Sequence, residues 1–342
     1  MQSDTIIDMV SAHAEGEVGN VITGGVAPPP GDTLWQMRDW LHADQSLRNL
    51  VLNEPRGGVF THMNLLVPPK DERAAVGFLT MEPEHTPPMS GSNAICVATV
   101  CLERGLVAMK EPETRFYLEA AAGLVAVRAT CRNGKALSIE ITNVASFADR
   151  LDVPLEIEGL GTHSVDIAYG GDSFVLIDAQ TLGFALRPDE GRDIAVLGAR
   201  ISRAANEQIG FSHPKECWNQ ISFCQFTGRT RIEDGILTGT SAVVIDPGKI
   251  DRSPCGTGCS ARMAVMEARG QLDVGARYCG RSIIGGRFDC RVAKRSRVAG
   301  KPAIVPTIAG RAWITGTHKI LRDPTDPWPE GYRVTDTWPA IL

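Results

Sequence analysis

Two stretches of this chain decide its fold: MSGSNAICVATVCLERGL at residues 89–106 and PCGTGCSARMAVMEARGQL at residues 254–272. Ser90-Gly91-Ser92 in the first aligns with Cys255-Gly256-Thr257 in the second, at an offset of 165 positions. Each stretch therefore carries a reactive hydroxyl or thiol, a glycine and a small hydroxyl residue ahead of an apolar helical pattern. Repetition of this kind predicts two structurally equivalent halves.

The two stretches also end alike. The same offset takes Arg104-Gly105 to Arg269-Gly270. A glycine directly after a helix suits a left-handed C-terminal cap. We therefore expect each half to contain one helix that begins at a reactive side chain and ends at a glycine.

The rest of the chain reads as many short strands with a few helices, which favours an α+β architecture over a doubly wound parallel sheet. The clearest β-like runs lie at 116–130, 137–144, 163–170, 173–179 and 241–247. The clearest helical patterns lie at 33–52, 94–105, 191–210 and 259–270.

Composition narrows the class of protein. The 342 residues are enough for two domains, and 43% hydrophobic with 22% charged residues is typical of a globular protein. The formal net charge of -5 and scattered basic residues argue against nucleic acid as a partner. No apolar run reaches the length of a membrane span, and the N-terminus does not resemble a secretory signal. Nine cysteines without a tight spacing framework indicate reduced thiols in the cytoplasm.

A helix start offers unpaired backbone N–H groups and a positive dipole end, which together suit a carboxylate. Gly91 and Gly256 would let a ligand approach the backbone closely. Such a position can also lower the pKa of the Cys255 thiol, which favours a role as base. A serine is a far weaker acid, so Ser90 as a base needs a partner. For either residue alone, a helix cap or a buried thiol is an adequate explanation; the matched pair favours function.

DRSPCGTGCSARMA (251–264) resembles the signature around one catalytic cysteine of proline racemases and hydroxyproline epimerases. PPMSGSNAICVATVCLERG (87–105) resembles the segment around the other, where the family usually has Met-Cys-Gly-His and this chain has Met89-Ser90-Gly91-Ser92. Further similar stretches extend the resemblance over nearly the whole chain. They are EPRGGVF (54–60), VDIAYGGDSFVLID (165–178), QFTGRT (225–230), GRAWITGTHKILRDPTDPWPEGY (310–332) and, more loosely, AHAEGEVGNVITGG (12–25).

The resemblance implies a fold like diaminopimelate epimerase: two similar α+β domains, each a curled sheet around a central helix, with the active site in the cleft between them. We place the first domain at 1–145 plus 318–342 and the second at 146–317. The resemblance implies no metal, pyridoxal phosphate or nicotinamide. The expected partners are a small-molecule substrate and a second copy of the chain in a homodimer.

By position in the family motif, Ser90 and Cys255 are the expected catalytic residues. Gly91, Ser92, Gly256 and Thr257 are expected to hold the substrate carboxylate, and Asp251 to contact the ring nitrogen, where an ammonium needs an anionic partner. His62 and His213 are further candidates for contact with a ring hydroxyl, although a lone histidine is more often structural.

Family members with two cysteines racemise proline or epimerise 4-hydroxyproline, because inversion needs one group on each face of the α-carbon. Members that lack one cysteine include dehydratases of trans-3-hydroxy-L-proline, in which one residue can remove the α-proton and protonate the leaving hydroxyl. Those enzymes typically keep the first cysteine and carry threonine at the second position; this chain has Ser90 and Cys255.

We therefore expect dehydration of trans-3-hydroxy-L-proline to Δ1-pyrroline-2-carboxylate. The alternative is 4-hydroxyproline 2-epimerase, converting trans-4-hydroxy-L-proline to cis-4-hydroxy-D-proline, either as the main activity or as a second activity of the same site; proline racemase ranks below both. A non-catalytic amino-acid binding protein is the alternative from another class. The sequence leaves open whether Ser90 or Cys255 takes the proton from the L-substrate.

Overall fold

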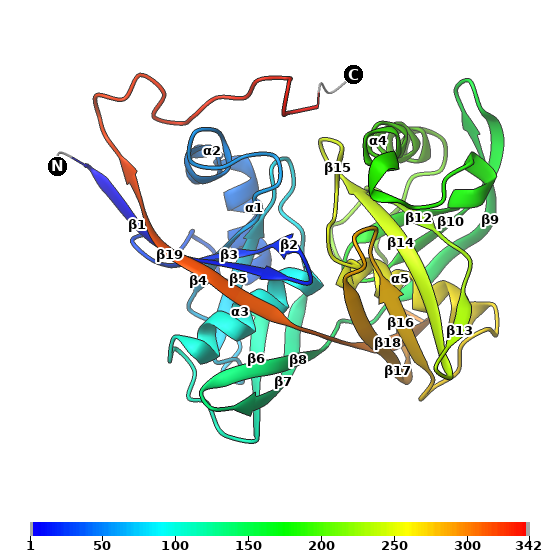
Figure 1. Cartoon of the computed structure of the whole chain (residues 1–342), viewed down its shortest axis with the longest axis horizontal. Helices are drawn as coiled ribbons and strands as arrows, with labels where there is room; N and C mark the ends of the chain where they lie inside the picture. Colours follow the sequence, from blue (N-terminus) through cyan, green and yellow to red (C-terminus); the bar gives the residue numbers. More distant parts are fainter. Residues whose placement is uncertain (1–2, 340–342) are drawn as a thin grey trace. The chain divides into compact units, whose positions relative to one another are not determined.

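The computed structural model describes residues 3–339, which divide into two compact units (Figure 1). The first unit combines the described residues up to Ile141 with those from Gly310 onward. The second runs from Thr142 to Ala309. The sequence places these boundaries after 145 and after 317, a few residues later in each case.

The first unit is a sheet in the spatial order β19-β1-β3-β4-β5-β6-β7. The pairs β3–β4 and β5–β6 are parallel and the others are antiparallel. Helices α1 and α2 connect the first parallel pair, and α3 connects the second. The elements are β1 (Thr5–Ala14), β2 (Glu17–Val18), β3 (Asn20–Gly24), α1 (Leu34–Ala43), α2 (Ser46–Leu52), β4 (Met63–Val67), β5 (Val76–Met81), α3 (Gly91–Glu103), β6 (Glu113–Ala120), β7 (Gly123–Arg132), β8 (Lys135–Thr142) and β19 (Ala312–Arg322).

The second unit repeats this arrangement in the order β9-β10-β11-β12-β14-β16-β17-β18. Its parallel pairs are β11–β12, connected through α4, and β14–β16, connected through α5. The elements are β9 (Phe147–Ile157), β10 (Gly161–Tyr169), β11 (Ser173–Asp178), α4 (Gly191–Gln208), β12 (Phe223–Thr227), β13 (Arg231–Glu233), β14 (Ile236–Ile245), β15 (Lys249–Ile250), α5 (Gly256–Ala268), β16 (Arg277–Arg281), β17 (Arg287–Val298) and β18 (Lys301–Gly310). Two short 3-10 helices (Ala179–Leu182 and Pro188–Glu190) precede α4.

The two repeated stretches form the corresponding helices α3 and α5. All residues of α3 from Gly91 to Leu102 are buried, as are those of α5 from Gly256 to Met266. Both helices end as the sequence predicts, because Gly105 and Gly270 adopt φ values of 72° and 69°. A side chain is disfavoured in that left-handed region, so glycine closes each helix.

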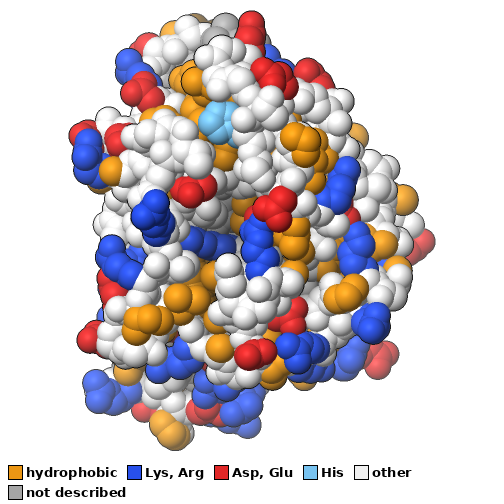
Figure 2. Space-filling view, turned by 90° about the vertical axis from the view of Figure 1, so that its right-hand side faces the viewer, with side chains coloured by type: hydrophobic (Ala, Val, Ile, Leu, Met, Phe, Trp, Pro, Cys, Tyr) orange, Lys and Arg blue, Asp and Glu red, His pale blue; other side chains and the backbone are white. Residues whose placement is uncertain are grey.

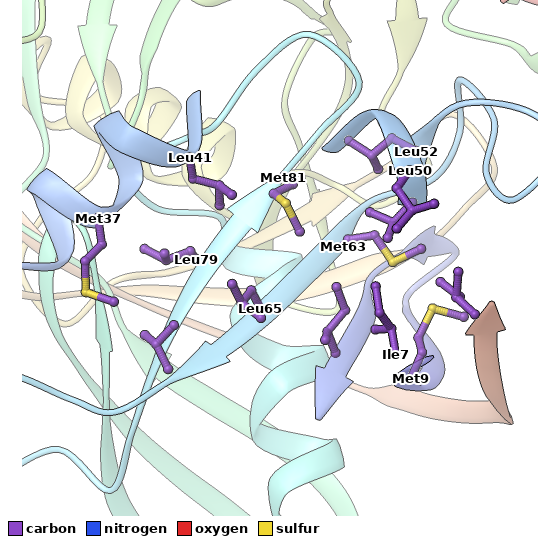
Figure 3. Close-up of a cluster of buried hydrophobic side chains, with 14 of the residues drawn as sticks. Ile7, Met9, Met37, Leu41, Leu50, Leu52, Met63, Leu65, Leu79 and Met81 are labelled. Atoms are coloured by element: carbon purple, nitrogen blue, oxygen red, sulfur yellow. The ribbon is translucent and has the colours of Figure 1, made fainter. Parts of the chain in front are cut away.

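In each unit, a cluster of buried apolar side chains packs helices against the sheet. In the first unit, a methionine-rich core joins α1 and α2 to the sheet; Met37, Leu41, Met63, Leu79 and Met81 belong to it (Figure 3). In the second unit, the cluster around α5 includes Phe174, Phe223, Val243, Val265 and the Cys255 side chain itself. Cys255 is therefore part of an apolar core as well as a helix start.

Two elements predicted from the sequence are divided in the structure. The helical pattern at 33–52 forms two helices, because the Asp44 carboxylate accepts a hydrogen bond from Ser46 N–H at 3.0 Å and starts α2 separately. The β-like run at 116–130 is a hairpin of β6 and β7, in which Gly123 has a φ of 123°. Short-range capping and turn chemistry decided both outcomes.

On the face shown in Figure 2, acidic and basic side chains lie among one another. Ion pairs among the described residues include those of Arg269 with Asp152 and Asp166, at 2.6 Å each. Within residues 3–339, none of the helices has both the length and the apolar character that crossing a membrane requires.

Gly170, in the turn between β10 and β11, provides a test of this packing. A Cβ at Gly170 would lie 2.1 Å from the Thr257 carbonyl oxygen and 2.6 Å from Ala261 N, both backbone atoms of α5. We expect Gly170→Ala to lower the free energy of unfolding by about 3 kcal/mol, because neither atom can move alone. Chemical denaturation followed by circular dichroism measures this change.

Gly191→Ala is the matched control, since its Cβ would meet only Ile250 Cδ1 at 3.7 Å. Its unfolding free energy should stay within about 1 kcal/mol of the parent value. Equal stability of the two variants would contradict the proposed packing of the turn on α5.

Candidate active site

The first half-site lies at the start of α3. Ser90 is the N-cap residue, with extended backbone angles (φ -137°, ψ 121°), and is 9% exposed. Its hydroxyl makes no capping hydrogen bond with the backbone of the helix. Instead, Ser90 Oγ accepts a hydrogen bond from Asn93 Nδ2 at 2.9 Å. Gly91 and Ser92 form the buried first turn beside it.

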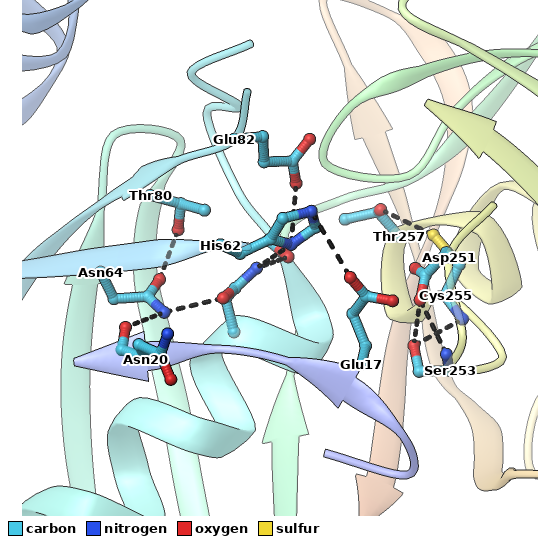
Figure 4. A network of polar contacts seen from close by, with 12 residues as sticks. Glu17, Asn20, His62, Asn64, Thr80, Glu82, Asp251, Ser253, Cys255 and Thr257 are labelled. Carbon is cyan, nitrogen blue, oxygen red and sulfur yellow. Dashed lines mark hydrogen bonds and ion pairs between the residues drawn. The ribbon is translucent and has the colours of Figure 1, made fainter. Parts of the chain in front are cut away.

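A chain of buried amides fixes the orientation of Asn93. Asn64 Nδ2 donates to the backbone carbonyl of Asn20 at 3.1 Å, and Asn64 Oδ1 accepts from Thr80 Oγ1 at 2.9 Å (Figure 4). Because a carbonyl can only accept, the Nδ2 side of Asn64 is defined. The same Nδ2 donates to Asn93 Oδ1 at 2.7 Å, so the other end of Asn93, its NH2 group, faces Ser90. We call this hydrogen-bonded set the amide chain; its members are Asn20, Asn64, Thr80, Asn93 and Ser90.

His62 lies behind the amide chain. Its Nε2 is 3.4 Å from Glu17 Oε1, and its Nδ1 is 3.7 Å from Glu82 Oε1 and 3.4 Å from Asn93 Nδ2 (Figure 4). All three side chains are almost fully buried. A tautomer with its proton on Nε2 can donate to Glu17 while Nδ1 accepts from Asn93. His62 therefore supports the amide chain through its contact with Asn93.

The second half-site lies at the start of α5. Cys255 Sγ accepts a hydrogen bond from Gly258 N–H at 3.3 Å and lies 3.5 Å from Thr257 Oγ1. Unlike Ser90, Cys255 has a positive φ of 61°, a region that non-glycine residues rarely occupy. Strained backbone of this kind is often found at functional sites.

Asp251 and Ser253 hold this strained backbone. The Asp251 carboxylate accepts hydrogen bonds from Ser253 N–H at 2.8 Å and Ser253 Oγ at 2.9 Å. Ser253 Oγ in turn accepts from Cys255 N–H at 3.1 Å (Figure 4). The sequence points to Asp251 as a substrate ligand, and the structure gives it a second task in shaping the loop before Cys255.

The thiol does not have the low pKa that its helix start predicts. Burial raises the pKa of Cys255 well above its usual value, and the nearby Asp251 charge raises it further. The hydrogen bonds from Thr257 and Gly258 oppose this effect but do not reverse it. The expectation of a lowered pKa is therefore wrong for the thiol in this environment, because desolvation outweighs the helix dipole.

The internal repeat extends to side chains that the sequence comparison missed. Asn64 on β4 bonds to Thr80 on β5, and Gln225 on β12 bonds to Ser241 on β14 at 3.1 Å. Both members of the second pair lie 161 positions after those of the first. Each unit thus places a buried amide, held by a hydroxyl on the neighbouring strand, against its central helix.

The structure groups the predicted site residues into two sets. Ser90, Gly91 and Ser92 lie at the start of α3 in the first unit. Asp251, Cys255, Gly256 and Thr257 lie at or just before the start of α5 in the second. Among the other candidates, His213 packs against Tyr169 with its ring tilted by 53° and 4.6 Å between ring centroids, and it accepts two backbone hydrogen bonds, a structural role.

Sequence reasoning missed Asn93, Asn64 and Ser253. Asn93 carried a weak signal, since an asparagine three residues after Ser90 occupies the position of Gly258 in the repeat. The sequence gives no signal for Asn64, because its contact with Asn93 depends on how β4 packs against α3.

Comparison with known proteins finds a family model and solved structures that match nearly the whole chain. A family model described as proline racemase matches residues 9–333. A hydroxyproline epimerase from Agrobacterium vitis, solved with trans-4-hydroxy-L-proline bound, is 38% identical; the match covers 100% of this chain and 99% of that one, with a TM-score of 0.94. A probable proline racemase from Agrobacterium radiobacter K84, solved with carbonate, is 37% identical over 98% of each chain, with a TM-score of 0.93.

More distant structures share the fold alone. A protein of the PhzF phenazine biosynthesis family from Bacillus anthracis is 12% identical, with a TM-score of 0.55 over 92% of this chain and 99% of that one. The predicted α+β class of the diaminopimelate epimerase type is confirmed by this group of structures.

The environment of Cys255 leads to a testable expectation. Since the Asp251 charge raises the pKa of Cys255, Asp251→Asn should lower that pKa while keeping the oxygen that accepts from Ser253. We expect alkylation of Cys255 by iodoacetamide at neutral pH to become faster, because a larger fraction of the thiol is ionised when its pKa is lower. Peptide mass spectrometry resolves the site of alkylation.

Asp273→Asn is the control, because the Asp273 side chain is 85% exposed and pairs with Arg295. It should leave the rate at Cys255 unchanged. Unchanged or slower alkylation in Asp251→Asn would contradict the assigned effect of the charge.

Proposed function

This chain belongs to the proline racemase family, and we propose on that premise that it is a 4-hydroxyproline 2-epimerase. It would convert trans-4-hydroxy-L-proline into cis-4-hydroxy-D-proline by inversion at the α-carbon. The observation that carries the proposal is the 38% identity, over essentially both whole chains, to an epimerase with that L-isomer bound. The acid–base residue at each of two equivalent helix starts supports it, since inversion needs two such groups.

We propose that Ser90 and Cys255 act on opposite faces of one substrate. In one direction, the Cys255 thiolate removes the α-proton, and the Ser90 hydroxyl delivers its own proton to the other face. This leaves a thiol and a Ser90 alkoxide, and the proton returns from the one to the other through solvent before the next turnover. In the reverse direction the alkoxide removes the proton and the thiol supplies one.

The helix starts supply the remaining functions. The backbone N–H groups after Gly91 and Gly256 would bind the substrate carboxylate, with Ser92 and Thr257 as hydroxyl donors. Asp251 would bind the ring ammonium. That contact would also offset the Asp251 charge, which raises the pKa of Cys255, so the substrate itself would favour formation of the thiolate.

Dehydration of trans-3-hydroxy-L-proline is the second candidate, and the sequence alone placed it first. The observation that favours it is the chemical difference between Ser90 and Cys255, because dehydration needs only one acid–base residue. The comparisons support the epimerase better. We further propose that the protein works in the cytoplasm as a homodimer and without a metal or organic cofactor.

Incubation with trans-4-hydroxy-L-proline in deuterated water tests the main proposal. We expect cis-4-hydroxy-D-proline with deuterium at the α-carbon, since the proton delivered comes from an enzyme group that exchanges with solvent. Proton NMR and chiral chromatography measure the two outcomes. Prior treatment with EDTA should leave the rate unchanged.

The same measurement on proline and trans-3-hydroxy-L-proline separates the alternatives. Faster formation of Δ1-pyrroline-2-carboxylate than of any D-isomer would make the chain a dehydratase. Binding of all three compounds without α-deuteration would identify a binding protein.

The two proposed acid–base residues can be tested separately. We expect Ser90→Ala and Cys255→Ala each to lower the rate of inversion by about 100-fold or more, the usual contribution of a general acid or base. Cys217→Ser is the control, because Cys217 is exposed and lies in neither half-site. A Cys255→Ala variant with near-normal inversion would overturn the mechanism. With trans-3-hydroxy-L-proline, the variant that loses dehydration identifies the residue on the L-face.

A further inference from the structure

We infer that Asn93 is the residue that makes a serine usable as an acid–base group in this chain. This inference rests on the proposed function, because it assigns Asn93 a positioning role for proton transfer by Ser90. It concerns a residue that the family resemblance did not single out, and it is carried by the amide chain of the first unit.

Only one orientation of the side-chain amides satisfies all the hydrogen bonds of the amide chain. It begins at a backbone carbonyl, Asn20 O, which must accept. The orientation of each amide group fixes that of the next, so Asn64 donates to Asn93 and Asn93 donates to Ser90 Oγ. Asn93 and Asn64 are fully buried, and Thr80 fixes the far side of Asn64. Rotating the Asn93 amide by half a turn would place its NH2 against the NH2 of Asn64.

This polarity has two chemical effects on Ser90. The Oγ lone pair that faces Asn93 is occupied, so the hydroxyl proton must point elsewhere and is available for transfer. Once that proton leaves, the bond from Asn93 becomes charge-assisted, which strengthens it and stabilises the alkoxide. An epimerase that works in both directions needs both effects, because Ser90 must donate in one and accept in the other.

The second unit shows why a thiol does not need this device. The position equivalent to Asn93 is Gly258, whose backbone N–H donates to Cys255 Sγ. A Cβ at Gly258 would lie 3.2 Å from Cys255 Sγ and from Gln225 Oε1, so any side chain at this position would be tightly packed. Cys255 thus receives its hydrogen bond from the backbone of Gly258. Ser90, which is less acidic, receives its hydrogen bond from the buried side chain at the equivalent position, Asn93.

Gly19 makes the room that Asn93 requires. A Cβ at Gly19 would lie 2.9 Å from Asn93 Oδ1 and 2.8 Å from Cys96 Sγ. Cys96 is buried within α3 and cannot move aside. The space that the amide chain needs therefore explains why residue 19, in the N-terminal stretch 12–25, is a glycine.

A thiol placed at position 90 can show whether Asn93 donates a hydrogen bond there, and this test needs no substrate. In a Cys217→Ser background, we would introduce Ser90→Cys with and without Asn93→Ala, and follow alkylation of the new thiol by iodoacetamide against pH. Loss of the donor should raise the midpoint by about 0.3 to 0.5 pH unit, because the thiolate loses a hydrogen bond but is a weaker acceptor than an alkoxide. Cys255, alkylated in the same samples, is the internal control and should keep its midpoint. An equal midpoint with and without Asn93 would overturn the inference even if the chain is an epimerase.

The kinetic test uses a double-mutant cycle on inversion of trans-4-hydroxy-L-proline. Asn93→Ala should lower kcat by about 10- to 100-fold in the parent chain but by less than about threefold beside Ser90→Cys, since a thiol depends less on the donor. Equal losses in both backgrounds would mean that Asn93 only supports the fold.

Gly19→Ala and Gly24→Ala form a matched pair for the same inference. A Cβ at Gly24 meets only the Asp8 side chain, at 3.4 Å or more, so this variant should keep its kcat. Gly19→Ala should lower kcat as Asn93→Ala does, because it displaces the Asn93 amide. Full activity of Gly19→Ala would contradict the inference. If the parent chain inverts no hydroxyproline, the proposed function fails, while the alkylation experiment still decides the role of Asn93.

Discussion

The first turn of a helix leaves backbone N–H groups without partners, and in this chain two such turns are buried among apolar side chains. One of these groups, Gly258 N–H, donates to Cys255 Sγ, and burial restricts the access of water to the others. Anything that binds beside them must therefore supply acceptor atoms, which a carboxylate does well. The residue before each turn, Ser90 or Cys255, is held next to the same group of donors. In the proposed mechanism, binding and proton transfer would therefore both depend on this one constraint on the backbone.

The two units share a strand order and a pattern of parallel pairs, but their reactive residues are adapted differently. Cys255 lies on strained backbone, held by Ser253 and Asp251, and its thiol receives a backbone hydrogen bond. Ser90 lies on ordinary extended backbone and receives its hydrogen bond from a side chain. A duplicated scaffold has therefore been fitted to two groups of different acidity by changing what surrounds each one.

Much of the fold could be predicted because its signals are local. The reactive residue, the following glycine and the closing Arg-Gly pair lie within single stretches of sequence, so both central helices and their equivalence are visible in the chain itself. The amide chain could not be predicted in this way. Asn20, Asn64 and Asn93 come from three elements, and their contact depends on the packing of α3 against the sheet. The raised pKa of Cys255 could not be predicted for a similar reason, since the burial of the thiol depends on the surrounding core.

Strand β19 pairs with β1 along its length, from Ala312 opposite Ala14 to Arg322 opposite Thr5. The first and last parts of the chain therefore share one sheet, with the whole second unit inserted between them. During synthesis on a ribosome, every residue of the second unit emerges before β19 does. The second unit can complete its sheet at once, whereas β1 must wait with one edge unpaired until β19 has emerged. The half-site that contains Ser90 is consequently the later of the two to mature.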